Sequence, residues 1–193
     1  MDIAQFNELV RNRRSVFPKQ FIAGKPVDEA IVKQILINAT WAPNHGHNEP
    51  WQFTVFSGKG LERFAAFQSE LYKKNAGDHF NEGKFTKLKE QPLMASHIIS
   101  IGMKRNPLTR VPEIEDIEAV ACAVQNIYLS VSAYGLGGYW TSGGVTYVEE
   151  AKAFFGLTEN DKLLGFFYIG HVAVPSPSAM RKPLEEKVNW VTE

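Results

Sequence analysis

The chain of 193 residues has a single cysteine, Cys122, and without a second one it cannot contain an internal disulfide framework. One thiol is also too few for a cysteine-rich metal centre. A charge excess is missing as well, because 21 basic residues balance 21 acidic ones. This balance argues against a general nucleic-acid or anionic-membrane binder, which would need a basic surplus, but it leaves room for a local basic pocket.

Long apolar runs are missing too, since no stretch of ~18 apolar residues could form a membrane-spanning helix. The first residues, MDIAQFNELVRNRR, lack the apolar core of a secretory signal, so we expect a cytoplasmic protein. No G-x-S-x-G nucleophile motif, P-loop or dinucleotide-binding G-x-G-x-x-G is present. Apolar residues nevertheless make up 44% of the chain, which is enough for the core of one domain over residues 1–193.

Apolar periodicity predicts helices alternating with a few strands, without repeats or linkers. The expected helices are 2–12, 28–41, 61–74, 113–134 and 149–155, and the expected strands are 52–56, 96–103 and 163–174. Residues 75–112 are interpreted as a partly helical excursion that caps a pocket. Residues 175–193 are interpreted as an extended arm, strand-like at 188–191, that packs on a partner subunit. These elements predict an α+β domain with a small sheet between helices.

The most distinctive stretch is WAPNHGHNEPWQF, residues 41–53. Each proline pushes the residue before it out of the helical region, so a polar loop should separate a helix from a strand. Polar side chains between two rigid turns suit a ligand-contacting loop, although a plain surface turn is an equal alternative. His45 and His47 would be two ligands of a metal site, but Glu49 is the single nearby candidate for a third. We therefore predict no metal site.

Two other stretches suit ligand binding. Arg13, Arg14 and Ser15 follow the first helix, and guanidinium and hydroxyl donors in this arrangement suit a phosphate. The alternative is a solvated helix end, where arginines also favour the helix dipole. The glycine-rich segment 137–144, GGYWTSGG, would let the backbone approach a flat ligand, with Trp140 as a wall. Its alternative is a tight connection after a long helix.

Taken in this order, the motifs resemble the nitroreductase family of FMN-dependent oxidoreductases. The matching parts are NRRSV at 12–16, APNHGHNEPWQF at 42–53, the long helix, GYWTSGG at 138–144, and LLGFFYIGHV at 163–172 with a later basic residue. The compact length is most similar to the small bacterial members of the YdjA type. The resemblance implies an α+β fold with a small mixed, mostly antiparallel sheet flanked by helices. It also implies an intertwined homodimer with exchanged C-terminal arms.

The same resemblance implies an FMN site at the dimer interface that both chains contact. Carried over by position, Arg13, Arg14 and Ser15 would bind the phosphate and ribityl end, and Arg181 would close the phosphate site. The remaining cofactor-binding residues would be Trp140, Thr141 and Ser142 along the ring edge, His45 and His47 near the flavin, and Trp41 and Pro43 from the other subunit. Trp41, His47 and Glu49 depart from the family pattern, which commonly has arginine, asparagine and glutamine there.

The implied reaction is ping-pong. NAD(P)H would pass hydride to flavin N5 and leave before a nitroaromatic, a quinone or a similar conjugated acceptor takes the electrons. The cofactor performs the chemistry, so no catalytic residue of the protein is assigned, and no readable 2′-phosphate site selects NADH or NADPH. Two alternatives share the fold: a flavin-binding or storage protein with little turnover, and a flavin-fragmenting or dehalogenating enzyme.

Overall fold

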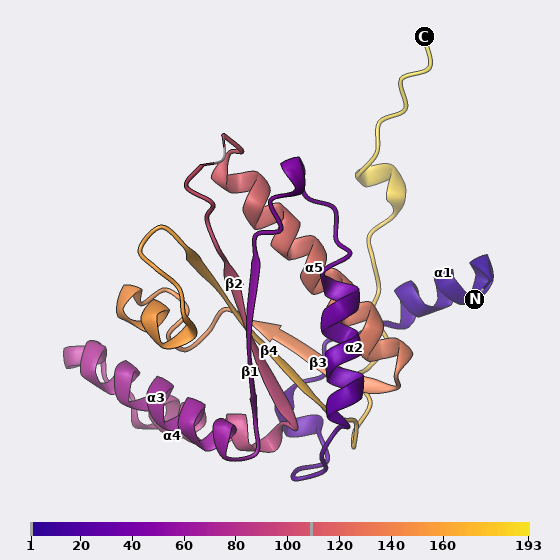
Figure 1. Cartoon of the computed structure of the whole chain (residues 1–193). Helices are drawn as coiled ribbons and strands as arrows, with labels where there is room; N and C mark the ends of the chain where they lie inside the picture. Colours follow the sequence, from indigo (N-terminus) through magenta and orange to yellow (C-terminus); the bar gives the residue numbers. More distant parts are fainter. Residues whose placement is uncertain (1, 109) are drawn as a thin grey trace.

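The computed structural model describes residues 2–108 and 110–193, and a four-stranded sheet lies at its centre (Figure 1). The strands are β1 (Trp51–Ser57), β2 (His97–Met103), β3 (Leu136–Thr141) and β4 (Lys162–His171), in the order β1-β2-β4-β3. All three ladders are antiparallel. In the part of the chain that is described, the one parallel contact is an isolated bridge between Ser15 and Gly138. The expected small, mostly antiparallel sheet is confirmed.

Helices cover both faces of this sheet. They are α1 (Ile3–Asn12), α2 (Glu29–Ala39), α3 (Lys59–Ala76), α4 (Glu82–Glu90) and α5 (Glu113–Ala133), with short 3-10 helices at 18–20, 45–47, 77–79, 91–94, 149–155 and 184–186. Helices α2 and α5 pack on one face, while α3 and the turn at 149–155 pack on the other, with α4 beside α3. The predicted α+β class is therefore confirmed.

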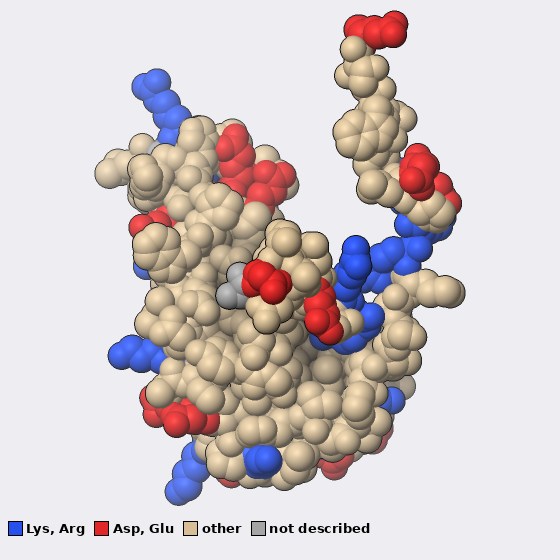
Figure 2. Space-filling view, turned by 90° about the vertical axis from the view of Figure 1, so that its right-hand side faces the viewer, with Lys and Arg blue, Asp and Glu red and all other residues tan. Residues whose placement is uncertain are grey.

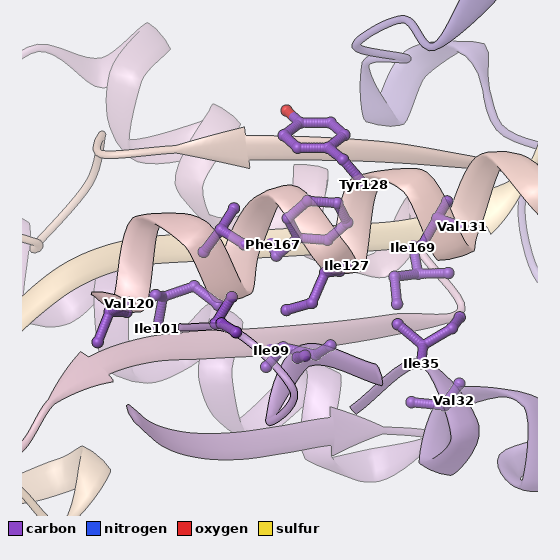
Figure 3. Packing of buried hydrophobic residues seen from close by; sticks show 14 of the residues in the cluster. Val32, Ile35, Ile99, Ile101, Val120, Ile127, Tyr128, Val131, Phe167 and Ile169 are labelled. Carbon is purple, nitrogen blue, oxygen red and sulfur yellow. The ribbon is translucent and has the colours of Figure 1, made fainter. Parts of the chain in front are cut away.

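Strand β2 is buried along its whole length because both of its faces are covered. Its alternating side chains send Ile99 and Ile101 towards α2 and α5, and Ile98 towards α3. Each fully buried side chain of this kind contributes about 1.5–3 kcal/mol relative to its exposed state. Figure 3 shows the first of these two cores, with Tyr128 at its edge and the tyrosine hydroxyl pointing away from the cluster.

Residues 136–141 form the strand β3, which was not among the expected strands, so the alternative of a tight connection over the glycine-rich segment is wrong. Gly137 and Gly138 hide the strand pattern, since they supply no side chain to alternate. A Cβ atom on Gly138 would lie 2.7 Å from the Phe167 ring, and one on Gly137 would lie 2.8 Å from the Phe21 ring. Glycine is needed in this strand because aromatic rings pack directly against its backbone.

The range 75–112, predicted as a partly helical excursion, contains the helix α4. It also contains β2, an inner strand of the sheet, which confirms the strand expected at 96–103. Thr109, in the same range, lies outside the described residues. The strand-like segment expected at 188–191 is not a strand in this chain. It belongs to an arm that leaves the body, where no sheet edge lies beside it and Trp190 is 82% exposed (Figures 1 and 2).

His97, at the start of β2, makes the stability of the fold depend on pH. The side chain is 6% exposed, and burial lowers its pKa from the ordinary value, with the charge of Glu29 opposing the shift. As the pH falls, His97 therefore takes up a proton in the unfolded chain before it does so in the folded protein. The contribution of neutral His97 to stability is complete above about pH 6.5, and it is lost as the pH falls towards the lowered pKa.

We expect the free energy of unfolding, measured by denaturant titration, to fall between pH 7.5 and pH 5.5, and to fall less in His97→Gln. His79→Gln changes an exposed histidine and serves as the control. Equal pH dependence in His97→Gln and the unsubstituted protein would contradict this account.

Candidate functional site

The segment that follows α1 lies along the outer edge of β3. The backbone N–H of Val16 donates to the Gly138 carbonyl at 2.9 Å. The Ser15 hydroxyl lies 3.1 Å from the hydroxyl of Tyr128 on α5, and this hydroxyl also accepts from the Trp140 N–H at 2.8 Å. Tyr128 therefore joins two predicted site residues, Ser15 and Trp140, that are far apart in the sequence. Tyr128 lies in an apolar stretch of the sequence, so no motif there indicated this role.

Two cationic side chains stand at this edge without a carboxylate partner. The Arg13 guanidinium lies 4.8 Å from the centre of the Tyr128 ring, and Arg14 donates to the carbonyls of Arg11 and Arg13 at 2.5 and 2.9 Å. Within the described residues, no ion pair involves Arg13 or Arg14. Both side chains are half-buried, so their charge is concentrated in one place that suits an anion.

The end of β3 separates two pockets. Thr141 lines the first, the α4-side pocket of about 300 Å³, together with Phe17, Tyr139, Gly143 and residues of α4. Trp140 and Ser142 line the second, the α5-side pocket of about 360 Å³, together with Ile117, Ala121, Tyr147 and Leu164. Side chains alternate along a strand, which is why Trp140 and Thr141 face different pockets. The three predicted ring-edge residues thus stand in the walls of neighbouring pockets.

Hydrogen bonds hold the end of β3 in place. The Trp140 indole N–H donates to the Leu164 carbonyl at 3.1 Å, which fixes the ring. The Gly143 N–H donates to the Thr141 hydroxyl oxygen at 3.1 Å, and the Thr146 hydroxyl donates to the Gly143 carbonyl at 2.8 Å. Gly144 has a φ of 68°, so the turn that follows needs glycine. The walls of both pockets are therefore built on a rigid turn.

The loop at 44–49 lies against the first turn of α5 instead. His45 Nδ1 lies 2.5 Å from a carboxylate oxygen of Glu115, and both His45 and His47 are exposed. Gly46, His47 and Glu49 have φ values of 62°, 52° and 44°, in the left-handed region that favours glycine. Side chains in such a backbone are strained, and the strain persists only where neighbouring contacts hold the loop.

Within one chain, the structure does not bring all predicted site residues together. His45 is tied to Glu115, whereas Ser15 is tied to Tyr128, and these two α5 residues lie about 20 Å apart along the helix. Trp41 and Pro43 are exposed near the His45 end, and Trp41 is 83% exposed. Arg181 lies in the arm, exposed, and donates to the carbonyl of its neighbour Met180 at 3.1 Å.

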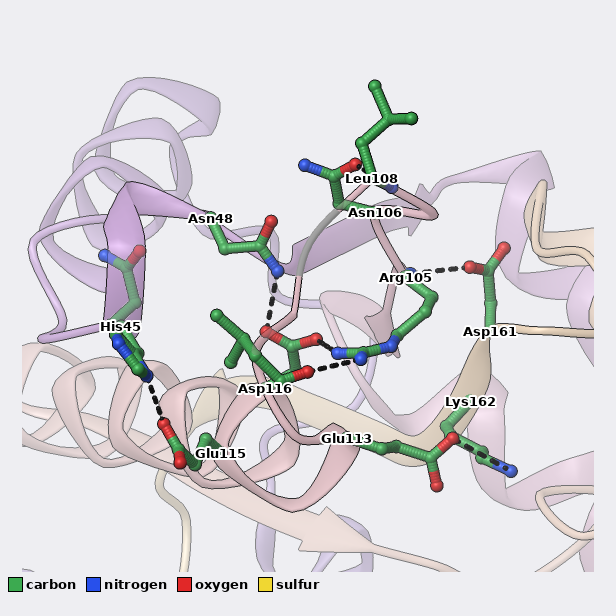
Figure 4. Close-up of polar contacts among 12 residues, drawn as sticks. His45, Asn48, Arg105, Asn106, Leu108, Glu113, Glu115, Asp116, Asp161 and Lys162 are labelled. Atoms are coloured by element: carbon green, nitrogen blue, oxygen red, sulfur yellow. Dashed lines mark hydrogen bonds and ion pairs between the residues drawn. The ribbon is translucent and has the colours of Figure 1, made fainter.

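A buried network anchors the 44–49 loop from below (Figure 4). Asp116 is 2% exposed, accepts from the Asn48 amide at 2.7 Å and forms an ion pair with Arg105. The Arg105 guanidinium also donates to the Val111 carbonyl, and its backbone N–H donates to Asp161 at 2.7 Å. No local sequence signal links these residues, because they come from four separate segments.

Asp161 ties the turn at 158–161 to this network. Burial works against ionisation of its carboxylate, but hydrogen bonds from the Thr158 N–H and hydroxyl and from the Arg105 N–H hold its pKa below the usual range. Asp161 is therefore a charged acceptor at neutral pH and fixes the chain on both sides of Arg105.

The described residues contain no helix that is both long and apolar enough to cross a membrane. In the same part of the chain, no three histidine, cysteine, aspartate or glutamate side chains are grouped so that they could hold a metal ion.

The network predicts that two neighbouring substitutions lower the free energy of unfolding by unequal amounts. Asp116→Asn leaves the Arg105 charge without its buried partner, so we expect a loss of about 3 kcal/mol in the free energy of unfolding. Glu115→Gln removes the exposed partner of His45 and should cost less than about 1 kcal/mol. Urea titration of both variants measures the difference, and equal losses would contradict the assignment of Asp116 as the anchor.

Comparison with known proteins agrees with this architecture. A model described as the Nitroreductase family matches residues 10–171. YdjA of Escherichia coli (strain K12), named as a candidate NAD(P)H nitroreductase, is 31% identical over 176 residues, which cover 91% of this chain and 93% of YdjA.

Two solved structures are similar over almost the whole chain. A nitroreductase-like family protein from Bacillus cereus has a TM-score of 0.81 and 27% identity, with 100% of this chain and 97% of that chain covered. The FMN-dependent nitroreductase NfnB from Mycobacterium smegmatis, solved in complex with NADPH, has a TM-score of 0.77 and 19% identity, with 99% and 100% covered. The chain therefore belongs to the nitroreductase family.

Proposed function

We propose that this protein is an FMN-dependent oxidoreductase that uses NADH or NADPH to reduce a nitroaromatic, a quinone or a similar conjugated acceptor. The observation that carries the proposal is the pair of uncompensated cations, Arg13 and Arg14, beside Ser15 at the edge of β3. The family membership supports it, as do the FMN dependence and the NADPH complex of the M. smegmatis protein and the NAD(P)H in the name of YdjA.

The residues at the edge of β3 fit the chemical groups of FMN. Arg13 and Arg14 offer the charge-assisted donors that a phosphate prefers, and the Ser15 hydroxyl offers a further polar contact. Thr141 and Ser142 stand at the end of the same strand, where the backbone turns through glycines and a flat ring can approach closely. The donor set therefore matches a phosphate at one end and a polar ring edge at the other.

FMN, when bound, supplies the hydride acceptance and the onward electron transfer of a ping-pong reaction. The protein's own residues bind and orient. Arg13 and Arg14 hold the anionic end, and Trp140 forms a fixed wall of the α5-side pocket through its bond to Leu164. None of these side chains is assigned a proton-transfer role.

We also propose that two copies of the single domain, residues 1–193, complete each site. The outward stripe of α5 exposes Ile114, Ala121 and Cys122, and the arm exposes Leu184 and Trp190. Apolar side chains exposed on a helix and on an arm suit a subunit interface. An exchanged arm and a paired α5 would bring Trp41, Pro43 and His45 of one chain towards Arg13 of the other, and Arg181 towards a phosphate.

The first experiment is the absorption spectrum of the purified protein after incubation with FMN. We expect a yellow protein that NADH or NADPH bleaches without oxygen and that menadione recolours. Arg13→Ala and Arg14→Ala should each weaken FMN binding about tenfold or more, because a charge-assisted hydrogen bond is lost. Arg63→Ala, an exposed arginine on α3, removes the same charge elsewhere and should leave FMN affinity unchanged.

A protein that takes up no FMN contradicts the proposal. Tightly bound FMN whose absorption neither dinucleotide bleaches would instead identify a flavin-storing protein.

The dimer can be tested through the single cysteine. Cys122 is exposed in one chain, so pairing of α5 should protect its thiol from a maleimide reagent. We expect slow labelling of Cys122 in the native protein and fast labelling of Glu62→Cys, an exposed α3 position, in a Cys122→Ala background. Fast labelling of Cys122 together with a monomeric mass in solution would contradict the proposed interface.

A further inference from the structure

The α4-side pocket does not end at the sheet. It adjoins a second hollow of about 550 Å³ between the short helix at 18–20 and α4. The two hollows share Phe17, Lys87 and Gln91 in their walls. Together the two neighbouring hollows are called here the α4 groove, which extends from Thr141 at the end of β3 outwards along α4.

Lysines outnumber acidic residues in the walls of the α4 groove. Lys19 and Lys87 line its outer hollow, where Glu90 is the one acidic residue, and Lys84 lines its inner hollow. Among the residues that the structure describes, none of these lysines forms an ion pair. Lys84 rests over the Tyr72 ring at 4.5 Å, a contact that leaves its charge free to attract an anion.

Helical spacing puts these groups on one side of α4. Lys84, Lys87 and Gln91 are three and then four residues apart, so they form one stripe that faces the groove. Lys89 lies on the same helix but lines neither hollow. Lys87 and Lys89 both lie in the last turn of α4, where a cation favours the helix dipole, so Lys89 provides an internal control for charge alone.

An aromatic surface stands at the junction of the two hollows. Phe17 is 43% exposed although its ring packs against Tyr139, with 4.6 Å between the ring centres. Exposed aromatic surface followed by lysines suits a ligand that has flat groups joined by phosphates. An elongated ligand of this kind can enter along α4 and reach the end of β3.

We propose that the α4 groove binds the diphosphate-bearing limb of the nicotinamide dinucleotide, with Lys87 and Lys19 as its cationic contacts. The inference rests on the proposed function, because the nicotinamide end must reach the flavin beside β3. It deepens that function by assigning the reductant a path that the neutral acceptor does not need. Lys87 is the specificity-determining residue of this path, since it lines both hollows.

The test uses the full-length, FMN-loaded protein in anaerobic stopped-flow measurements. Reduction by NADPH and by NADH is followed at increasing dinucleotide concentration, and reoxidation is followed with menadione, which carries no phosphate. In Lys87→Gln and Lys19→Gln we expect the concentration for half-maximal reduction to rise about tenfold, as for one lost charge-assisted contact. Lys87→Arg should stay close to the unsubstituted protein, and Lys89→Gln should match it. Rates with menadione should not change.

The proposal is overturned if Lys87→Gln behaves like Lys89→Gln, or if reoxidation by menadione slows as much as reduction. A second measurement separates this outcome from failure of the proposed function. Calorimetric titration with adenosine 5′-diphosphate, which carries the diphosphate, needs no turnover, and its binding should be about tenfold weaker in Lys87→Gln than in the unsubstituted protein. If neither dinucleotide reduces the protein, the proposed function fails, and the comparison with adenosine 5′-diphosphate still decides whether the groove binds a nucleotide diphosphate.

Discussion

Strand β3 is at the edge of the sheet, and the rest of the candidate site depends on how the backbone hydrogen-bonding groups of that edge find partners. An unpaired edge exposes backbone donors and acceptors, and proteins cover such edges or use them for binding. Here the segment after α1 supplies one bond from Val16 to Gly138, and Tyr128 supplies another by accepting from Trp140. The same two contacts fix Ser15 and place Arg13 over the Tyr128 ring. The contacts that cover the edge of β3 therefore also position the residues that suit an anion. Both depend on the glycines of β3, because larger residues there would displace Phe167 and Phe21.

The length of α5 explains why one chain holds only part of the predicted site. Its first turn carries Glu115, which holds His45, and its fourth to fifth turn carries Tyr128, which holds Ser15. A straight helix keeps these groups about 20 Å apart, beyond the reach of any side chain. Antiparallel pairing of two such helices would bring the first turn of one close to the later turns of the other. Such pairing would bury the exposed side of α5, which carries Ile114, Ala121 and Cys122 among polar residues, and the arm that leaves the body agrees with it.

The sequence was sufficient for the elements with strong periodicity. The helices α2, α3 and α5 and the strands β1, β2 and β4 all lie close to their expected positions, because their apolar residues recur at helical or strand spacing. It failed for β3, whose pattern is interrupted by Gly137 and Gly138, and for the end of the arm, where strand formation would need a neighbour that this chain does not provide. The family resemblance assigned Arg13 and Ser15 to a phosphate end and Trp140 to a ring edge, and these roles stay predictions. The link from Ser15 to Trp140 through Tyr128 and the bond between Asn48 and Asp116 could not be predicted, since both depend on long-range packing.

The loop at 44–49 shows how strained backbone positions depend on a buried anchor. His47 and Glu49, which stand where the family resemblance led us to expect asparagine and glutamine, both have positive φ. Asparagine and histidine both tolerate that region comparatively well. Glutamine and glutamate have the same branching, so either residue has a similar steric cost of about 1–2 kcal/mol at position 49. Such a loop keeps its shape only if something else holds it, and the buried bond from Asn48 to Asp116 does so between the two strained residues. The hydrogen bond from Asn48 to Asp116 therefore allows the loop to keep its strained backbone. Substitutions at His47 and Glu49 can alter the chemistry of the exposed loop because Asp116, paired with Arg105 beneath it, keeps the backbone in place.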